Sequence, residues 1–203
     1  MTPVLTRTFP APPVDRREAL RYAGCRTPEP ETGTLLDGVI AETEGAFDYR
    51  VCWRELPLET DGSVCRFGEA FSVSSGALSA ALAGCERALL FAATLGVGPD
   101  RLIARYGRSS PARALMLQAL GAERVEALCD LFCETYAREA GVALTPRFSP
   151  GYGDLPLETQ REVFAVLDCP RRLGITLTGS LLTSPSKSVT AFAGIRKKAG
   201  TTL

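Results

Sequence analysis

Hydrophobic and polar positions follow two different periods along this chain of 203 residues. Between residues 111 and 140, apolar residues recur every three or four positions, which predicts one helix of about thirty residues. Pro111 suits its first turn and Gly141 suits its end. The predicted core stripe of this helix consists of Leu117, Leu120, Val125, Leu128, Phe132 and Tyr136.

Other segments with a helical period are shorter. Residues 14–24 begin with Asp15 in an N-cap position and end at Gly24. Helices are also predicted over residues 34–47, 101–107 and 157–168. The mostly apolar run at 79–93 predicts one more helix.

Alternation of apolar and polar residues predicts strands in the remaining segments. Residues 47–56 place Phe47, Tyr49, Val51 and Trp53 on one face. Residues 63–73 predict another strand or short hairpin, and residues 174–195 predict two strands joined by a turn at 184–187. Because helices and strands mix without regular βαβ units, we expect an α+β fold with an antiparallel β-sheet packed with helices. Residues 1–13, with four prolines, are predicted to form a flexible N-terminal arm before a single domain at 14–203.

Composition narrows the class of protein. Lysine and arginine together number 23 and so do aspartate and glutamate, so no net charge points to nucleic acid or an anionic membrane. No apolar stretch approaches the roughly 20 residues of a membrane span, and no export signal stands at the N-terminus. The seven cysteines have irregular spacing, which is typical of a reducing compartment. We therefore expect a cytoplasmic protein.

The chain has no histidine, which excludes Ser-His and Cys-His nucleophile pairs and histidine-ligated metals. No CxxC pair is present, so we expect no metal site and interpret most cysteines as small buried residues. The sequence also lacks GxGxxG and GxxxxGK[ST]. A Rossmann cofactor site and a P-loop are therefore not expected, and no catalytic residue is predicted.

Two carboxylates on the long predicted helix, Glu126 and Asp130, stand four residues apart and so project from one line. A solvated helix face explains this spacing. A groove edge that binds an ammonium group or ribose hydroxyls explains it as well.

The segment RFSPGYGDLPLETQ at 147–160 concentrates unusual residue types. Pro146 and Pro150 restrict the backbone on both sides of residues 147–149. Gly151 and Gly153 flank Tyr152, so the main chain can approach a ligand closely. Such a loop offers a guanidinium for a carboxylate, backbone groups for a base edge and an aromatic ring for stacking. A rigid structural turn accounts for the same residues, and the residues alone leave both interpretations open.

This segment, followed by LTGSLLTSPSKSVTAFAGI, resembles the activation domain of cobalamin-dependent methionine synthase, in particular its small stand-alone forms. The resemblance continues through FAATLGVGPDRLIARYG, GAERVEALCDLFC and DRREALRYAG, so it covers most of the chain. It implies an α+β fold and a non-Rossmann site for S-adenosylmethionine (SAM). In that family the activation domain presents SAM to cob(II)alamin, while a flavodoxin-like donor supplies an electron for reductive methylation.

The resemblance assigns roles to individual residues. Arg147 corresponds to the arginine that engages the SAM carboxylate, and Ser149 to a main-chain contact. Glu126 corresponds to a SAM-binding acid, whereas Asp130 gains no role. Tyr152 corresponds to a tyrosine that faces the corrin. Residues 153–156 read Gly-Asp-Leu-Pro where the synthase has Pro-Ala-Cys-Pro.

The sequence therefore predicts a SAM-binding reactivation protein for a methionine synthase that lacks its own activation domain. Cobalamin would be carried by that partner, so the chain is expected to be an accessory to a methyltransferase rather than an independent enzyme. The alternative is a non-catalytic binding module for another corrinoid protein, without SAM.

Overall fold

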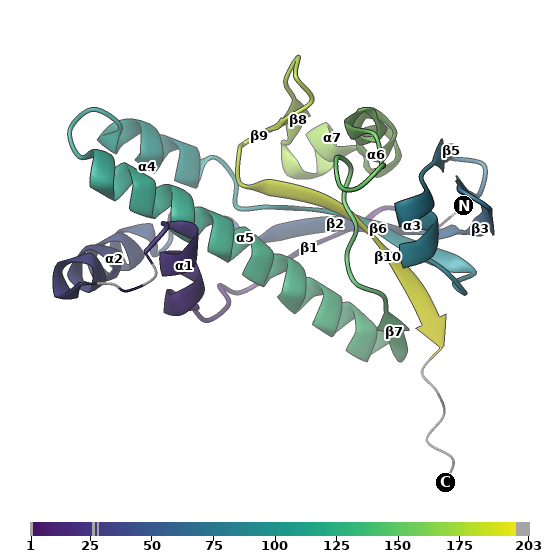
Figure 1. Cartoon of the computed structure of the whole chain (residues 1–203), viewed down its shortest axis with the longest axis horizontal. Helices are drawn as coiled ribbons and strands as arrows, with labels where there is room; N and C mark the ends of the chain where they lie inside the picture. The colour runs from purple at the N-terminus through teal and green to yellow at the C-terminus, as the bar shows by residue number, and fades with distance from the viewer. Residues whose placement is uncertain (1, 26, 28, 198–203) are drawn as a thin grey trace, which may run out of the picture.

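The computed structural model describes residues 2–25, 27 and 29–197, and a five-stranded antiparallel sheet crosses its centre (Figure 1). Across the sheet, the strand order is β1 (Leu5–Thr8), β2 (Arg50–Pro57), β6 (Arg87–Thr94), β10 (Ser188–Lys197) and β7 (Val142–Leu144). A smaller sheet contains β3 (Glu59–Asp61), β4 (Val64–Phe67) and β5 (Phe71–Ser74), and a short pair contains β8 (Thr176–Leu177) and β9 (Thr183–Ser184). The predicted α+β class with an antiparallel sheet is confirmed.

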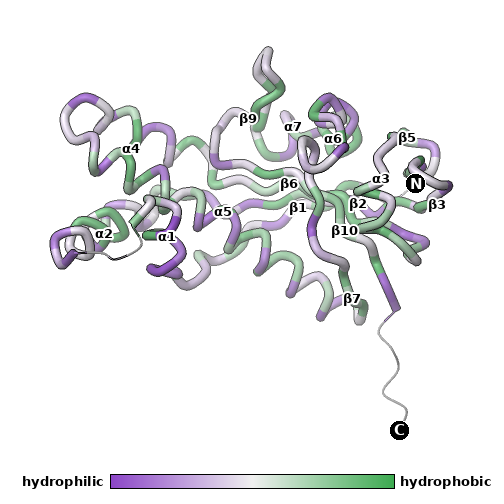
Figure 2. The backbone as a smooth tube through the Cα atoms, viewed as in Figure 1, coloured by the Kyte–Doolittle hydropathy of each residue, from purple (hydrophilic) through white to green (hydrophobic). Residues whose placement is uncertain are grey.

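Helices cover both faces of the central sheet. The long helix α5 (Pro111–Ala140) crosses one face, where Phe132 packs against Phe91 and Trp53. Three short helices cover the other face: α3 (Gly76–Ala81), α6 (Gln160–Leu167), which follows a 3-10 turn at Leu157–Thr159, and α7 (Cys169–Leu173). Hydrophobic residues run continuously through the central strands (Figure 2). The sheet is therefore the apolar middle layer of the molecule.

A third hydrophobic cluster lies around the first half of α5. Helices α1 (Arg16–Tyr22), α2 (Pro30–Thr43) and α4 (Gly98–Tyr106) pack there, with Ala19 and Leu36 buried against Met116 and Leu120. The predicted long helix and its complete core stripe are confirmed. The helix continues through Gly121, where a Cβ would lie 3.0 Å from Cε of Lys187.

The predicted helix at 79–93 is wrong. Helix α3 ends at Ala81, and the apolar residues that follow form β6, whose positions after Arg87 are all buried. A strand covered on both faces has no polar side, so its sequence reads as an unbroken apolar run like that of a buried helix.

The N-terminal residues also differ from the predicted flexible arm. Residues Leu5–Thr8 form an edge strand paired with Arg50–Trp53 of β2, and the Phe9 amide donates to the Tyr49 carbonyl at 2.8 Å. Phe9 is buried in the same cluster as Phe132. Prolines disfavour a central strand, but an edge strand tolerates them at its ends.

Neither a membrane-spanning helix nor a metal-binding cluster occurs in the described part of the chain. None of its helices combines the length and hydropathy that a membrane crossing needs. It holds no group of three or more Cys, Asp or Glu residues placed to share a metal ion. All seven cysteines are described and free, and all except Cys25 and Cys133 are buried.

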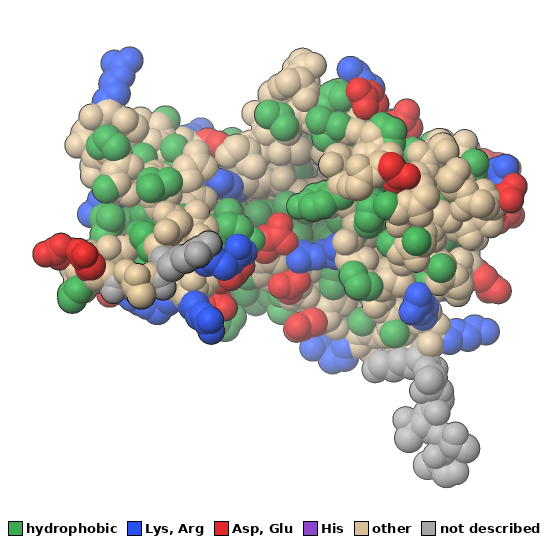
Figure 3. Space-filling view, viewed as in Figure 1, with side chains coloured by type: hydrophobic (Ala, Val, Ile, Leu, Met, Phe, Trp, Pro, Cys, Tyr) green, Lys and Arg blue, Asp and Glu red, His purple; other side chains and the backbone are tan. Residues whose placement is uncertain are grey.

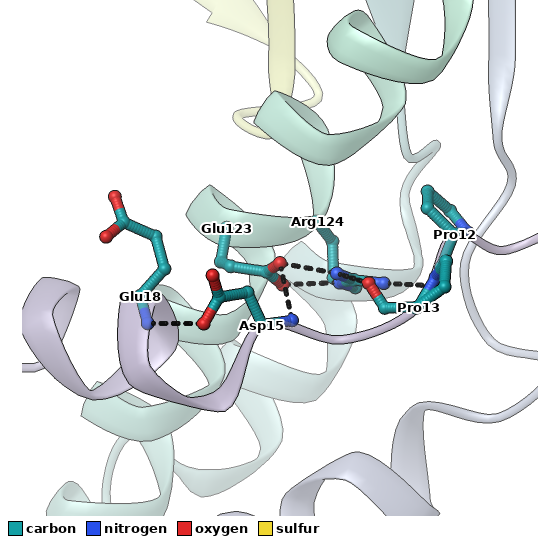
Figure 4. A network of polar contacts seen from close by, with 6 residues as sticks. All are labelled: Pro12, Pro13, Asp15, Glu18, Glu123 and Arg124. Atoms are coloured by element: carbon teal, nitrogen blue, oxygen red, sulfur yellow. Dashed lines mark hydrogen bonds and ion pairs between the residues drawn. The ribbon is translucent and has the colours of Figure 1, made fainter.

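Two buried charges on α5 fasten the N-terminal segment to the helix (Figure 4). Glu123 and Arg124 are 3% and 2% exposed and form an ion pair. The Arg124 guanidinium donates to the carbonyls of Pro12 and Pro13, and Glu123 accepts from the Asp15 amide at 3.1 Å. The Asp15 side chain then caps α1 by accepting from the Glu18 amide at 3.0 Å.

Replacing Glu123 with alanine should strongly destabilise the protein, because it leaves the Arg124 charge buried without its counter-ion. We expect the free energy of unfolding to fall by about 3–5 kcal/mol, measured by urea denaturation. The matched control is Glu139→Ala, which removes the exposed partner of Arg7 and should change stability far less. Equal losses in the two variants would contradict the importance of the buried pair.

Candidate functional site

The segment after β7 follows the edge of β10 and thereby places Arg147. The Thr145 amide donates to the Gly194 carbonyl at 2.9 Å, and Phe148 and Phe192 exchange two backbone hydrogen bonds at 2.9 and 2.8 Å. Phe148 packs into the core beside α6. Since neighbouring residues of an extended chain point to opposite faces, Arg147 points toward α5.

Arg147 meets two carboxylates on α5. Its Nη2 atom lies 2.9 Å from Oε2 of Glu126 and 2.9 Å from Oδ1 of Asp130. Its side chain is 25% exposed, and its Nη1 atom is buried without a hydrogen-bond partner. Burial lowers the pKa of Arg147 while neighbouring acidic groups raise it, and the net change is a rise, so the guanidinium stays charged. One donor of this charged group is therefore left without a hydrogen bond within the chain.

A cavity of about 190 Å³ opens beside this arginine. Glu126, Arg147, Ser149 and Tyr152 line it, together with Phe148, Val189 and Ala191. In the space-filling view, acidic and basic side chains gather in a hollow over the middle of α5 (Figure 3). The structure thus brings the four residues singled out from the sequence into one cavity.

A second cavity of about 190 Å³ adjoins the first, because the same Glu126, Ser149 and Tyr152 contribute to its lining. Its other walls come from the β8–β9 hairpin, α6 and β10, and include Leu181 and Gln160. The two cavities form one groove with a charged end and a more apolar end.

Backbone groups at the open edge of β10 face this groove. Phe148 pairs with Phe192, and the alternation of an antiparallel ladder turns the N–H and C=O of Thr190 toward the same edge. The Thr190 hydroxyl donates to Oε1 of Gln160 at 2.7 Å. Neither Thr190 nor Gln160 was predicted from the sequence as a site residue. The sequence signal for this part of the site was Thr190, a polar residue within the otherwise apolar run of the last strand.

The glycine-rich loop is held in a fixed shape by its own backbone. The Tyr152 amide donates to the Ser149 carbonyl at 3.1 Å, and the Gly151 amide donates to the Leu155 carbonyl at 3.0 Å. Gly151 and Gly153 have φ values of 89° and 55°, a region that side chains disfavour. The ring of Tyr152 projects from this turn and is 67% exposed.

Asp154 anchors the loop to the small helix α3. Its carboxylate accepts hydrogen bonds from the Ser75 hydroxyl, from the Gly76 amide at 2.8 Å and from the Ala77 amide at 3.1 Å. These donors, the Ser75 hydroxyl foremost, hold the pKa of Asp154 below its ordinary value. The aspartate of this segment is therefore structural, a role the sequence did not reveal.

The sequence matches no model of a known protein family and no curated protein. Among solved structures, one similar chain is described as the MetH reactivation domain bound to AdoHcy. The TM-score is 0.73, with 98% of this chain and 80% of that chain covered and 15% sequence identity. This chain has the fold of that reactivation domain. The fold implied by the sequence resemblance is confirmed, whereas the roles of Glu126, Arg147, Ser149 and Tyr152 stay predictions.

The anchoring role of Asp154 predicts a specific acid titration. A lowered pKa means that the carboxylate stabilises the loop at pH values above about 3.9, the value in an unfolded chain. This contribution is lost as pH falls through the lower folded-state pKa. The amide resonances of Gly76 and Ala77 should therefore titrate with a midpoint below about 3.9, followed by NMR. In Asp154→Asn they should not titrate there. A midpoint at or above 3.9 in the parent protein would contradict the anchor.

Proposed function

We propose that this chain is a SAM-binding reactivation protein that supports reductive methylation of cob(II)alamin on a methionine synthase without its own activation domain. The observation that carries the proposal is Arg147, which lines a cavity with Glu126 and whose buried Nη1 has no hydrogen-bond partner within the chain. A buried guanidinium donor without a partner is costly, and a ligand carboxylate would satisfy it. The shared fold with a domain that binds AdoHcy supports the same ligand class.

The charged groups of SAM fit the residues of the groove. Its carboxylate would bind Arg147 and its ammonium group would bind Glu126, because each pair joins opposite charges through a charge-assisted hydrogen bond. Main-chain groups at Ser149 and Thr190 would hydrogen-bond the polar edges of the adenosine moiety. Leu157 and Leu181 provide apolar surface at that end.

The chain's own contribution is positioning. The methyl transfer itself needs a corrinoid carried by the partner and one electron from a flavodoxin-like reductant. Within the chain, the fixed loop and α5 hold the ligand in one orientation, which lowers the entropic cost of the transfer. Tyr152, whose side chain is 67% exposed, would contact the corrin on the docked partner. No general base is required of this histidine-free chain.

One observation favours the alternative, a non-catalytic module for another corrinoid protein without SAM. The Arg147 charge is already met by Glu126 and Asp130 within the chain. Such a cluster also suits a purely structural ion pair. Capture of corrinoid proteins by the immobilised chain, in the presence and absence of SAM, separates the two functions, because only the first predicts capture that SAM strengthens.

Titration calorimetry with SAM tests the ligand assignment. Arg147→Ala should weaken binding by about 10- to 100-fold, the equivalent of one lost charge-assisted hydrogen bond. Glu126→Gln should also weaken it. The control is Arg171→Ala, since that side chain is 86% exposed and lies on α7, away from the groove. The absence of SAM binding at millimolar concentration, with and without a cob(II)alamin partner, would refute the assignment.

Tyr152→Ala should separate ligand binding from docking. Tyr152 lines the groove but is 67% exposed, so we expect SAM affinity to change less than the rate of partner reactivation. The rate is followed by the visible absorbance of the partner's corrinoid. A parallel loss of affinity and rate would instead place Tyr152 in the ligand site alone.

A further inference from the structure

We infer that Asp130 makes the groove prefer the cationic methyl donor SAM over its neutral demethylated product, S-adenosylhomocysteine. The inference rests on the proposed function and assigns a role to a residue that the sequence resemblance left without one. It concerns the balance of charge around Arg147.

The charge cluster at the groove carries one more negative than positive charge. Arg147 forms ion pairs with both Glu126 and Asp130, and both involve the same Nη2 atom. Among the described residues that line the two cavities of the groove, no other lysine, arginine, aspartate or glutamate occurs. One negative charge is therefore left over among Arg147, its two carboxylate partners and the described residues that line the groove.

The two ligands differ by one methyl group and one positive charge. Both carry a carboxylate, an ammonium group and an adenosine moiety, so contacts with these groups contribute to both affinities alike. The sulfonium of SAM adds a unit positive charge that the thioether of the product lacks. A surplus negative charge nearby lowers the free energy of the bound sulfonium form selectively.

Asp130 rather than Glu126 carries this selectivity. Glu126 lines both cavities and faces the ammonium group that the two ligands share. Asp130 lines neither cavity. It lies beyond Arg147, in a neighbouring cleft with Cys133 and Pro146. It therefore acts through Arg147 and through its field, and we class it as a specificity-determining residue that does not touch the ligand.

The expected size of the preference for SAM depends on how exposed Asp130 is to solvent. The Asp130 side chain is 65% exposed, so water and salt screen its charge. Exposed charge pairs of this kind change an equilibrium by about 1.5- to 5-fold. The same preference promotes turnover, because loss of the methyl group removes the charge that Asp130 attracts and weakens the hold on the product.

The test compares dissociation constants for SAM and S-adenosylhomocysteine by calorimetry at low ionic strength. The ratio of the two constants cancels effects on the groups that the ligands share. Asp130→Asn should reduce the preference for SAM by about 1.5- to 5-fold. The matched control is Glu134→Gln, which makes the same charge change one turn along α5 at an exposed position outside the groove. It should leave the ratio unchanged.

Salt and a conservative variant complete the experiment. Raising the salt concentration should reduce the preference of the parent protein and have little effect on Asp130→Asn, whereas Asp130→Glu should retain the preference. An unchanged ratio in Asp130→Asn, with SAM still bound, would overturn this inference and leave the proposed function intact. Failure of the parent protein to bind either ligand would overturn the proposed function and this inference with it.

Discussion

The buried pair of Glu123 and Arg124 on α5 is the interaction on which the rest of the structure depends. Neither charge reaches water, so each needs partners inside the protein. The carbonyls of Pro12 and Pro13 and the Asp15 amide provide them. Because these groups lie between β1 and α1, satisfying one charged pair fixes an edge strand and a helix on the same long helix.

Arg124, which is buried, and Arg147, which is half-buried, differ in how their guanidinium groups are hydrogen-bonded. All three guanidinium nitrogens of Arg124 donate hydrogen bonds, to Glu123 and to the carbonyls of Pro12 and Pro13. Arg147 uses Nη2 for two carboxylates while Nη1 stays buried without a partner. The first arrangement stabilises the fold, and the second offers a preorganised donor at the groove. Whether the guanidinium nitrogens all have hydrogen-bond partners thus distinguishes an arginine that stabilises the fold from one that is a candidate for ligand binding.

The groove is rigid because each of its walls is part of a larger element. Its floor belongs to β10, which is paired with β6 along eight residues. One side is α5, and the other is a loop fastened by its own hydrogen bonds and by Asp154 at the start of α3. A site that works by holding one molecule against another gains from such stiffness, since less conformational entropy is lost on binding.

Local sequence patterns predicted correctly the elements that bury one face and expose the other to solvent. The period of α5 reflects one apolar stripe that packs against the sheet and against the helices around its first half, so sequence alone located the helix and its core residues. For β6 the pattern failed, because burial on both faces removed the polar positions that identify a strand. The strand at Leu5–Thr8 was not predicted from the sequence. Its pairing with β2 is a contact between distant segments that no local signal records.

The sequence by itself determined which residue types were present for the candidate site: an arginine and a tyrosine in a glycine-rich loop, and carboxylates on one line of a helix. Only the tertiary structure decided how they meet. Glu126 and Arg147 are joined by an ion pair because β7 and the following residues turn back along β10 and bring the loop over α5. The free donor of Arg147 and the cap formed by Asp154 arise from that packing. Hydrogen bonds between segments far apart in the chain depend on their arrangement in space, which residue order alone does not specify.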